Sequence, residues 1–154
     1  MFRHQNEGYG LLYKLMSDDS DVSKIVIFTR ADDSVVSLIK EIATASQAAK
    51  KQMDEFPKSD SHIEYDESDL PKLEAKGREL QSSQDTKGLL SSRGKDFEVL
   101  LIFTQAQATD YAVQLCEALI ENEKDPTRQA FLTNLSKQFA AFHERLMNLL
   151  TVKS

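Results

Sequence analysis

Apolar residues recur every three or four positions through most of this chain, which is the spacing of one face of a helix. The clearest case closes the sequence, where residues 94–150 form two long amphipathic stretches joined by a short connector at 122–126. A helical hairpin of that length needs further helices to cover its apolar stripes, and the preceding two-thirds of the chain can supply them. The pattern therefore predicts a helical protein.

The first expected helix spans residues 7–29 and has a weak middle, because the polar run at 17–21 interrupts its apolar positions. Serine and aspartate compete for backbone hydrogen bonds inside a helix. Either the helix breaks at this run and restarts at Asp21, or the run forms a solvated face. Residues 25–28 alone would suit a strand, but nothing nearby in the sequence pairs with them.

A firmer second helix is expected to begin with a cap at Asp32 or Asp33 and to end at Pro57. Residues 43–49 are small on every face, which lets a neighbouring helix approach closely. The apolar stripe recurs at spacings of three and four: Val35, Leu38, Ile42, Ala45, Ala49, Met53 and Phe56.

An acidic connector over residues 57–69 is longer than most loops between helices, so we expect it to cross the end of a bundle. A looser helical segment follows over 70–90, weakened by glycines and serines, and a break is expected within 82–93. This segment supplies an extra short helix between the second and third long helices.

The third long helix is expected to start at 92–96, and the fourth has Asp125 as its cap and Pro126 in its first turn. Together these patterns predict one all-α domain over residues 1–154, an antiparallel four-helix bundle, with residues 1–18 as a candidate peripheral segment. The expected common core is Phe97, Leu101, Leu115, Leu135, Phe139 and Leu146.

Composition narrows the classes of partner. The chain has 154 residues, 40% of them hydrophobic, which suits one domain with a real core. Its net charge of −6 disfavours nucleic acid and anionic lipid, since both bind basic surfaces. No apolar run approaches the ~20 residues that span a bilayer, so we expect a soluble chain without membrane insertion. A periplasmic location would require a targeting segment removed ahead of Met1.

The sequence contains few residues in arrangements that could carry out catalysis. A di-metal carboxylate site in a bundle needs Glu-x-x-His on each of two helices, and the chain contains none. Cys116 would need a base and an orienting group to act as a nucleophile, and a buried inert thiol is expected instead. His4 and His62 lie in polar segments, while His143 adjoins the apolar stripe of the fourth helix. His143 is either a metal ligand or proton carrier or, as we favour, a boundary residue that packs on the core.

Two short motifs resemble a known family of proteins: residues 94–98 followed by Gln105, and Asp125-Pro126 leading to residues 143–146. They resemble the third and fourth helices of the DUF4142 family, a bacterial ferritin-like group of four-helix bundles with no assigned activity. That family opens its third helix with Gly-x-x-Phe-Asp and has a histidine near the end of its fourth. Glu98 and His143 occupy those places, and the resemblance covers roughly residues 20–150.

The chain departs from that family in its second and third helices, where relatives often carry histidines. The corresponding stretches here, around Ser46 and around Thr109-Asp110, have none. The resemblance supports the fold and adds little about chemistry. We expect a non-catalytic domain, structural or protein-binding, with a stress or envelope role in a bacterium. The alternative is a degenerate ferritin-like metal or small-ligand binder that uses His143 and Glu98. We expect no cofactor, no catalytic residues and no enzymatic activity.

The protein partner is not identified by the sequence, but a homodimer is one candidate assembly. The polar run at 17–21 weakens the first helix, so apolar residues ahead of it exceed what one core-facing stripe needs. Uncovered apolar surface on a bundle is commonly buried against another subunit. The expected interface is Tyr9, Leu12, Tyr13 and Met16.

Overall fold

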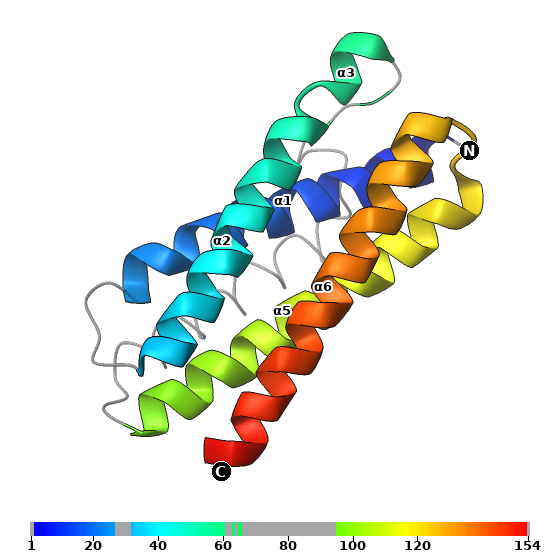
Figure 1. Ribbon diagram of the computed structural model, residues 1–154. Coiled ribbons are helices and arrows are strands. Elements are labelled where there is room, and N and C mark those ends of the chain that lie inside the picture. Colours follow the sequence, from blue (N-terminus) through cyan, green and yellow to red (C-terminus); the bar gives the residue numbers. More distant parts are fainter. Residues whose placement is uncertain (1, 27–31, 61–62, 64, 66–94, 154) are drawn as a thin grey trace.

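The computed structural model of this protein describes residues 2–26, 32–60, 63, 65 and 95–153, and every regular element among them is a helix. The all-α prediction is therefore confirmed for these residues. The looser segment expected over 70–90 lies outside them. The helices are α1 (Phe2–Val26), α2 (Asp33–Met53), the short α3 (Phe56–Ser59), α5 (Lys95–Asn122) and α6 (Pro126–Lys153) (Figure 1).

The four long helices lie side by side. α1 packs on both α2 and α5, and α5 packs along α6 (Figure 1). Contacts between α5 and α6 occur in opposite order along the two helices, since Ala106 meets His143 while Glu123 meets Arg128. The two helices therefore run in opposite directions from their short connector.

On each long helix, one set of buried positions recurs in alternating steps of three and four. This period near 3.5 residues is typical of helices whose side chains interlock along a shared seam. Of the predicted core, five residues are buried, while Leu115 is only partly covered because the seam of α5 passes through Ala112 and Cys116 instead. The seam of α2 is Val35, Ile39, Ile42, Ser46, Ala49 and Met53, and that of α6 is Leu132, Leu135, Phe139, Phe142 and Leu146.

α1 differs from its prediction. It begins at Phe2 rather than at residue 7, and it continues without a break through the polar run at 17–21. Ser20 Oγ donates to the carbonyl of Ser17 at 2.7 Å, so one polar side chain bonds back within the helix instead of ending it. Asp19 is buried, so the run is not simply a solvated face. Tertiary packing of the apolar face stabilises a helix that propensity alone would not.

The residues expected to remain uncovered lie in the core. Tyr9, Leu12 and Met16 are completely buried within their own chain, and Tyr13 is partly buried, so the first three offer no exposed surface to a second subunit. One cause is a close approach of α1 to α5 at Gly8, where a Cβ would stand 2.7 Å from Leu119 Cδ2. Because α1 lies this close to α5, the apolar stripe of α1 is covered within its own chain. The oligomeric state itself stays a prediction.

The observed helix ends agree in part with those predicted from the sequence. Asp125 caps α6 as expected, since its Oδ2 accepts the N–H of Arg128 at 2.9 Å. Asp32 stands at the N-cap of α2, but its side chain makes no capping bond. α2 ends at Met53, earlier than predicted, and Pro57 lies in the first turn of α3 rather than ending α2.

Candidate functional site

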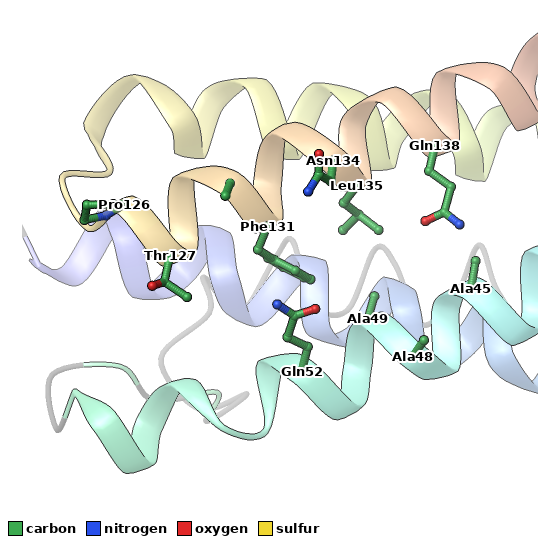
Figure 2. Close-up of a pocket in the computed structure, with 11 residues that line it drawn as sticks. Ala45, Ala48, Ala49, Gln52, Pro126, Thr127, Phe131, Asn134, Leu135 and Gln138 are labelled. Carbon is green, nitrogen blue, oxygen red and sulfur yellow. The ribbon is translucent and has the colours of Figure 1, made fainter.

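A groove runs between α2 and α6 on the described surface. Two adjoining hollows of about 560 and 540 Å³ make it up, and both are lined by Ala45, Ala48 and Gln138. The groove is open to solvent along its length. Figure 2 shows its deeper part, where side chains from the two helices face one another across the gap.

The floor of the deeper part of the groove is apolar and buried, whereas its walls are exposed and uncharged. Ala45 and Ala49 form the floor from α2, and Phe131 and Leu135 form it from α6. The walls of the deeper part carry methyl, hydroxyl and carboxamide groups: Ala48, Gln52, Thr127, Ala130, Asn134 and Gln138.

The small stretch at 43–49 explains why the groove exists. These residues were expected to let a neighbouring helix approach closely, but α6 does not close onto them. Phe131 and Leu135 reach across from α6, while the lining residues of this stretch of α2 in the deeper part, Ala45, Ala48 and Ala49, offer only methyl groups in return (Figure 2). The space left over is what forms the groove, so the alanines of α2 create a hollow rather than a tight contact.

A surface ion pair bridges the two helices near the other end of the groove. Arg145 Nη2 donates to Glu41 Oε2 at 2.6 Å, and both side chains are about half exposed. The hydrogen bond from Arg145 lowers the pKa of Glu41. Among the described residues that line the groove, the charged ones are Lys40 and Glu41.

His143 is committed to a structural contact. Its Nδ1 lies 2.9 Å from the carbonyl oxygen of Ala106 and 3.4 Å from Thr109 Oγ1. A carbonyl oxygen only accepts, so Nδ1 carries the hydrogen. The ring is partly buried. This geometry is that of the boundary residue favoured by the sequence.

Glu98, the other weak candidate, serves a different contact. Its buried carboxylate accepts the backbone N–H of Asp32 at 2.8 Å, which ties the start of α2 to α5. Eight residues separate Glu98 from Ala106, or about 12 Å along the helix. One ion therefore cannot contact both Glu98 and His143. Among the residues that the structure describes, no group of three or more His, Cys, Asp or Glu side chains is placed to hold a metal.

Cys116 is buried in the core, and burial raises the pKa of its thiol to about 12. A thiol with so high a pKa is almost entirely protonated at neutral pH and is a poor nucleophile. The expectation of a buried cysteine is confirmed, and its environment is that of an inert thiol.

A buried polar cluster at the α5–α6 turn was missed by sequence reasoning. The Glu123 carboxylate accepts hydrogen bonds from the Tyr9 hydroxyl and from Arg128, whose Nε lies 2.6 Å from Oε1. The backbone amides of Lys124 and Asp125 donate to its other oxygen at 3.0 and 3.3 Å. We call Tyr9, Glu123 and Arg128 the clamp, because they join α1, α5 and α6.

Electrostatics identify the clamp as structural. Burial raises the pKa of Glu123, but the hydrogen bonds from Arg128 and Tyr9 outweigh it, so the net pKa lies below the ordinary value. Burial and the bond to Glu123 raise the pKa of the Tyr9 hydroxyl. Arg128 also pairs with Asp60 at 3.2 Å, next to α3. Both oxygens of Glu123 are fully engaged, so the cluster has no free group to offer a substrate.

One sequence signal pointed to the clamp. Glu123 continues the stripe of α5 that runs through Ala112, Cys116 and Leu119, and a charge on such a stripe needs a partner. Arg128 stands five residues later, across the connector. Spacing alone does not show that the turn brings them together or that Tyr9 completes the cluster.

Comparison of the chain with models of protein families, with curated proteins and with solved structures gives no match. Across the described residues, no helix combines the length and the apolar character needed to span a bilayer. The geometry of the groove and of the clamp is thus what a functional proposal has to rest on.

Proposed function

We propose that this protein is a non-catalytic helical-bundle domain that binds a helix of a protein partner in the α2–α6 groove. The groove itself is the observation behind this proposal. It is long, apolar at its floor and free of charged side chains in its deeper part. A helix laid into a hydrophobic groove is a recurring mode of protein recognition.

The shape of the groove favours an elongated occupant over a small molecule. Small-molecule sites enclose most of the surface of their ligand. This groove stays open along its length, and its two hollows continue into one another past Ala45, Ala48 and Gln138. A partner helix would cover the exposed walls and complete the packing of Phe131 and Leu135.

The chemical state of the reactive side chains also supports a binding role. Cys116 is buried with a raised pKa, His143 bonds to a backbone carbonyl, and Glu123 is consumed by the clamp. Catalysis needs a nucleophile or base within reach of a bound substrate. None of these three side chains lines the groove.

The finer fold assignment belongs to the same proposal. We infer an antiparallel four-helix bundle of ferritin-like type, supported by the opposite directions of α5 and α6 and by the seams of the long helices. Membership of the DUF4142 family, with a bacterial stress or envelope role, rests on the short motifs of the third and fourth helices alone.

The alternative, a degenerate metal or small-ligand binder, is not favoured because Glu98 and His143 lie apart. Elemental analysis of protein purified without chelators separates the two. We expect no stoichiometric iron, manganese or zinc. A near-equimolar metal that is lost on His143→Ala would put the alternative first.

The binding role is tested by filling the groove. Ala48→Trp on α2 and Ala130→Trp on α6 each place a large ring in its wall. Ala118→Trp on the exposed face of α5 is the matched control. Cross-linking in the native cell should yield one partner with the wild type and the control, joined to groove residues, and should lose it with both groove variants. Cross-links on another face, or a partner retained by the groove variants, would overturn the proposal.

A further inference from the structure

The deeper part of the groove is neutral along both walls. The described residues that line it include no Asp, Glu, Lys, Arg or His. On α6 this lining runs over residues 127–138, which is about 16 Å or three helical turns. Lys40 and Glu41 line only the second hollow. A charged side chain placed in the deeper part would therefore lose water without gaining an opposite charge.

Three carboxamide groups line this neutral part and are exposed: Gln52 on α2, and Asn134 and Gln138 one turn apart on α6. Figure 2 shows Gln52 and Gln138 pointing into the gap from opposite helices. Within the part of the chain that the structure describes, none of the three side chains has a hydrogen-bond partner. Each carboxamide has two N–H donors and an accepting oxygen. Both walls thus offer donors and acceptors together, which another carboxamide or a hydroxyl can match without leaving a charge unpaired.

The floor between these walls sets the shape of what can fill it. Ala45 and Ala49 bring only methyl groups from α2, and Phe131 and Leu135 bring apolar bulk from α6. A helix laid on this floor would face it with apolar residues and face the walls with the rows on either side. Positions i, i+4 and i+7 of such a helix form one row of about 10 Å, which lies within the length of the neutral wall.

We infer that the deeper part of the groove selects against charge and receives a helix of another protein with an apolar central ridge and Gln, Asn or Ser in the flanking rows. Gln52 and Gln138 are the residues that determine this specificity, because they approach the occupant from opposite sides. The inference rests on the proposed function and names the chemistry of its partner.

Three synthetic helical peptides of matched length test the inference. All carry the same ridge of Ala and Leu and the same outer face, and they differ at i, i+4 and i+7 of one flank, which holds Gln, Glu or Lys. Amide chemical shifts of the labelled protein locate binding, and titrations at low and high salt measure affinity. The Gln peptide should shift the amides of Ala48, Ala130 and Gln138. It should bind about tenfold more tightly than either charged peptide at both salt concentrations.

Removal of the carboxamides supplies the second arm. The double variant Gln52→Ala with Gln138→Ala should bind the Gln peptide about tenfold more weakly than the wild type. Gln47→Ala with Gln107→Ala is the matched control, since both glutamines are exposed and neither lines the groove. Its affinity should equal that of the wild type.

Three results would overturn the inference. Equal or tighter binding of a charged peptide in the groove would remove the selection against charge and leave the docking role standing. An unchanged affinity in the Gln52→Ala, Gln138→Ala variant would remove the role of the carboxamides. Groove amides that shift with protein concentration alone would show that a second copy occupies the site. Failure of all three peptides to bind there would also overturn it, whereas the cross-linking test decides the proposed function separately.

Discussion

Two arginine–glutamate pairs of equal length hold different parts of this molecule together. Arg128 Nε lies 2.6 Å from Glu123 Oε1, and Arg145 Nη2 lies 2.6 Å from Glu41 Oε2. The first pair belongs to the clamp, where the side chains are 13% and 2% exposed. The second bridges the open groove, where both are 49% exposed. Since the two pairs have the same length, they differ in how deeply their side chains are buried.

The surroundings of the two pairs differ in the same way, with the first pair enclosed and the second exposed. At the clamp, Tyr9 and two backbone amides complete the coordination of Glu123, and α1, α5 and α6 meet there. At the groove, α2 and α6 face one another over alanines, and the Glu41–Arg145 pair is the bridge that water can reach. The clamp end is therefore joined by buried polar contacts, whereas the groove between α2 and α6 is open to solvent.

The largest expected effect comes from opening the clamp. Arg128→Ala should lower the free energy of unfolding by about 3–5 kcal/mol, because it leaves the buried Glu123 charge without its partner. Arg145→Ala is the matched control and should cost about 1 kcal/mol or less, since its pair is exposed and screened. Urea denaturation followed by circular dichroism measures both. Equal losses in the two variants would show that burial does not distinguish the pairs.

Leu132 and Leu135 on α6 allow an enclosed core position to be compared with a position in the groove floor within one helix. Leu132 is fully buried away from the groove, and Leu135 is buried in its floor. Each change to alanine should cost about 2–5 kcal/mol, with Leu132→Ala nearer the upper end because its cavity is enclosed. A loss of about 0.5 kcal/mol or less for Leu135→Ala would mean that Leu135 is not part of the core.

Acid should weaken the clamp before it weakens the rest of the core. The pKa of Glu123 in the folded chain is below its unfolded value of about 4.3. Its contribution to stability is therefore present above that pH and is lost as pH falls through the folded pKa. Glu123→Gln should be less stable than the wild type at pH 6, and the difference should shrink towards pH 3. Glu41→Gln is the exposed control, and its smaller difference should fade with added salt.

The sequence predicted α6 and its contacts with α5 better than it predicted the groove between α2 and α6. The α6 start at Asp125-Pro126, the burial of Phe139 and Leu146 and the boundary position of His143 all follow from spacing and capping chemistry within one helix. Such signals are local, so they survive any arrangement of the other helices.

The misses share a dependence on tertiary structure. Helix propensity at 17–21 predicted an interruption, but the core contacts of α1 override it. The alanines of α2 predicted a close contact, yet whether a neighbouring helix fills that space depends on its side chains. The clamp joins residues 114 positions apart, Tyr9 and Glu123, which no local pattern reveals.

The smallest expected effect concerns two hydroxyls on the seams. Ser46 on α2 is completely buried, and its Oγ has no hydrogen-bond partner among the described residues. Thr109 on α5 is equally buried, but its Oγ1 donates towards the carbonyls of Gln105 and Ala106 at 2.9 and 3.0 Å. Ser46→Ala should therefore raise the free energy of unfolding by up to about 1 kcal/mol, because it removes an unbonded buried hydroxyl and introduces the best helix former. Thr109→Val should lower it by about 1 kcal/mol, since it deletes a bond that is made. Thermal and urea unfolding of both variants decide the signs. A loss of stability in Ser46→Ala as large as that in Thr109→Val would mean that the Ser46 hydroxyl is bonded in solution.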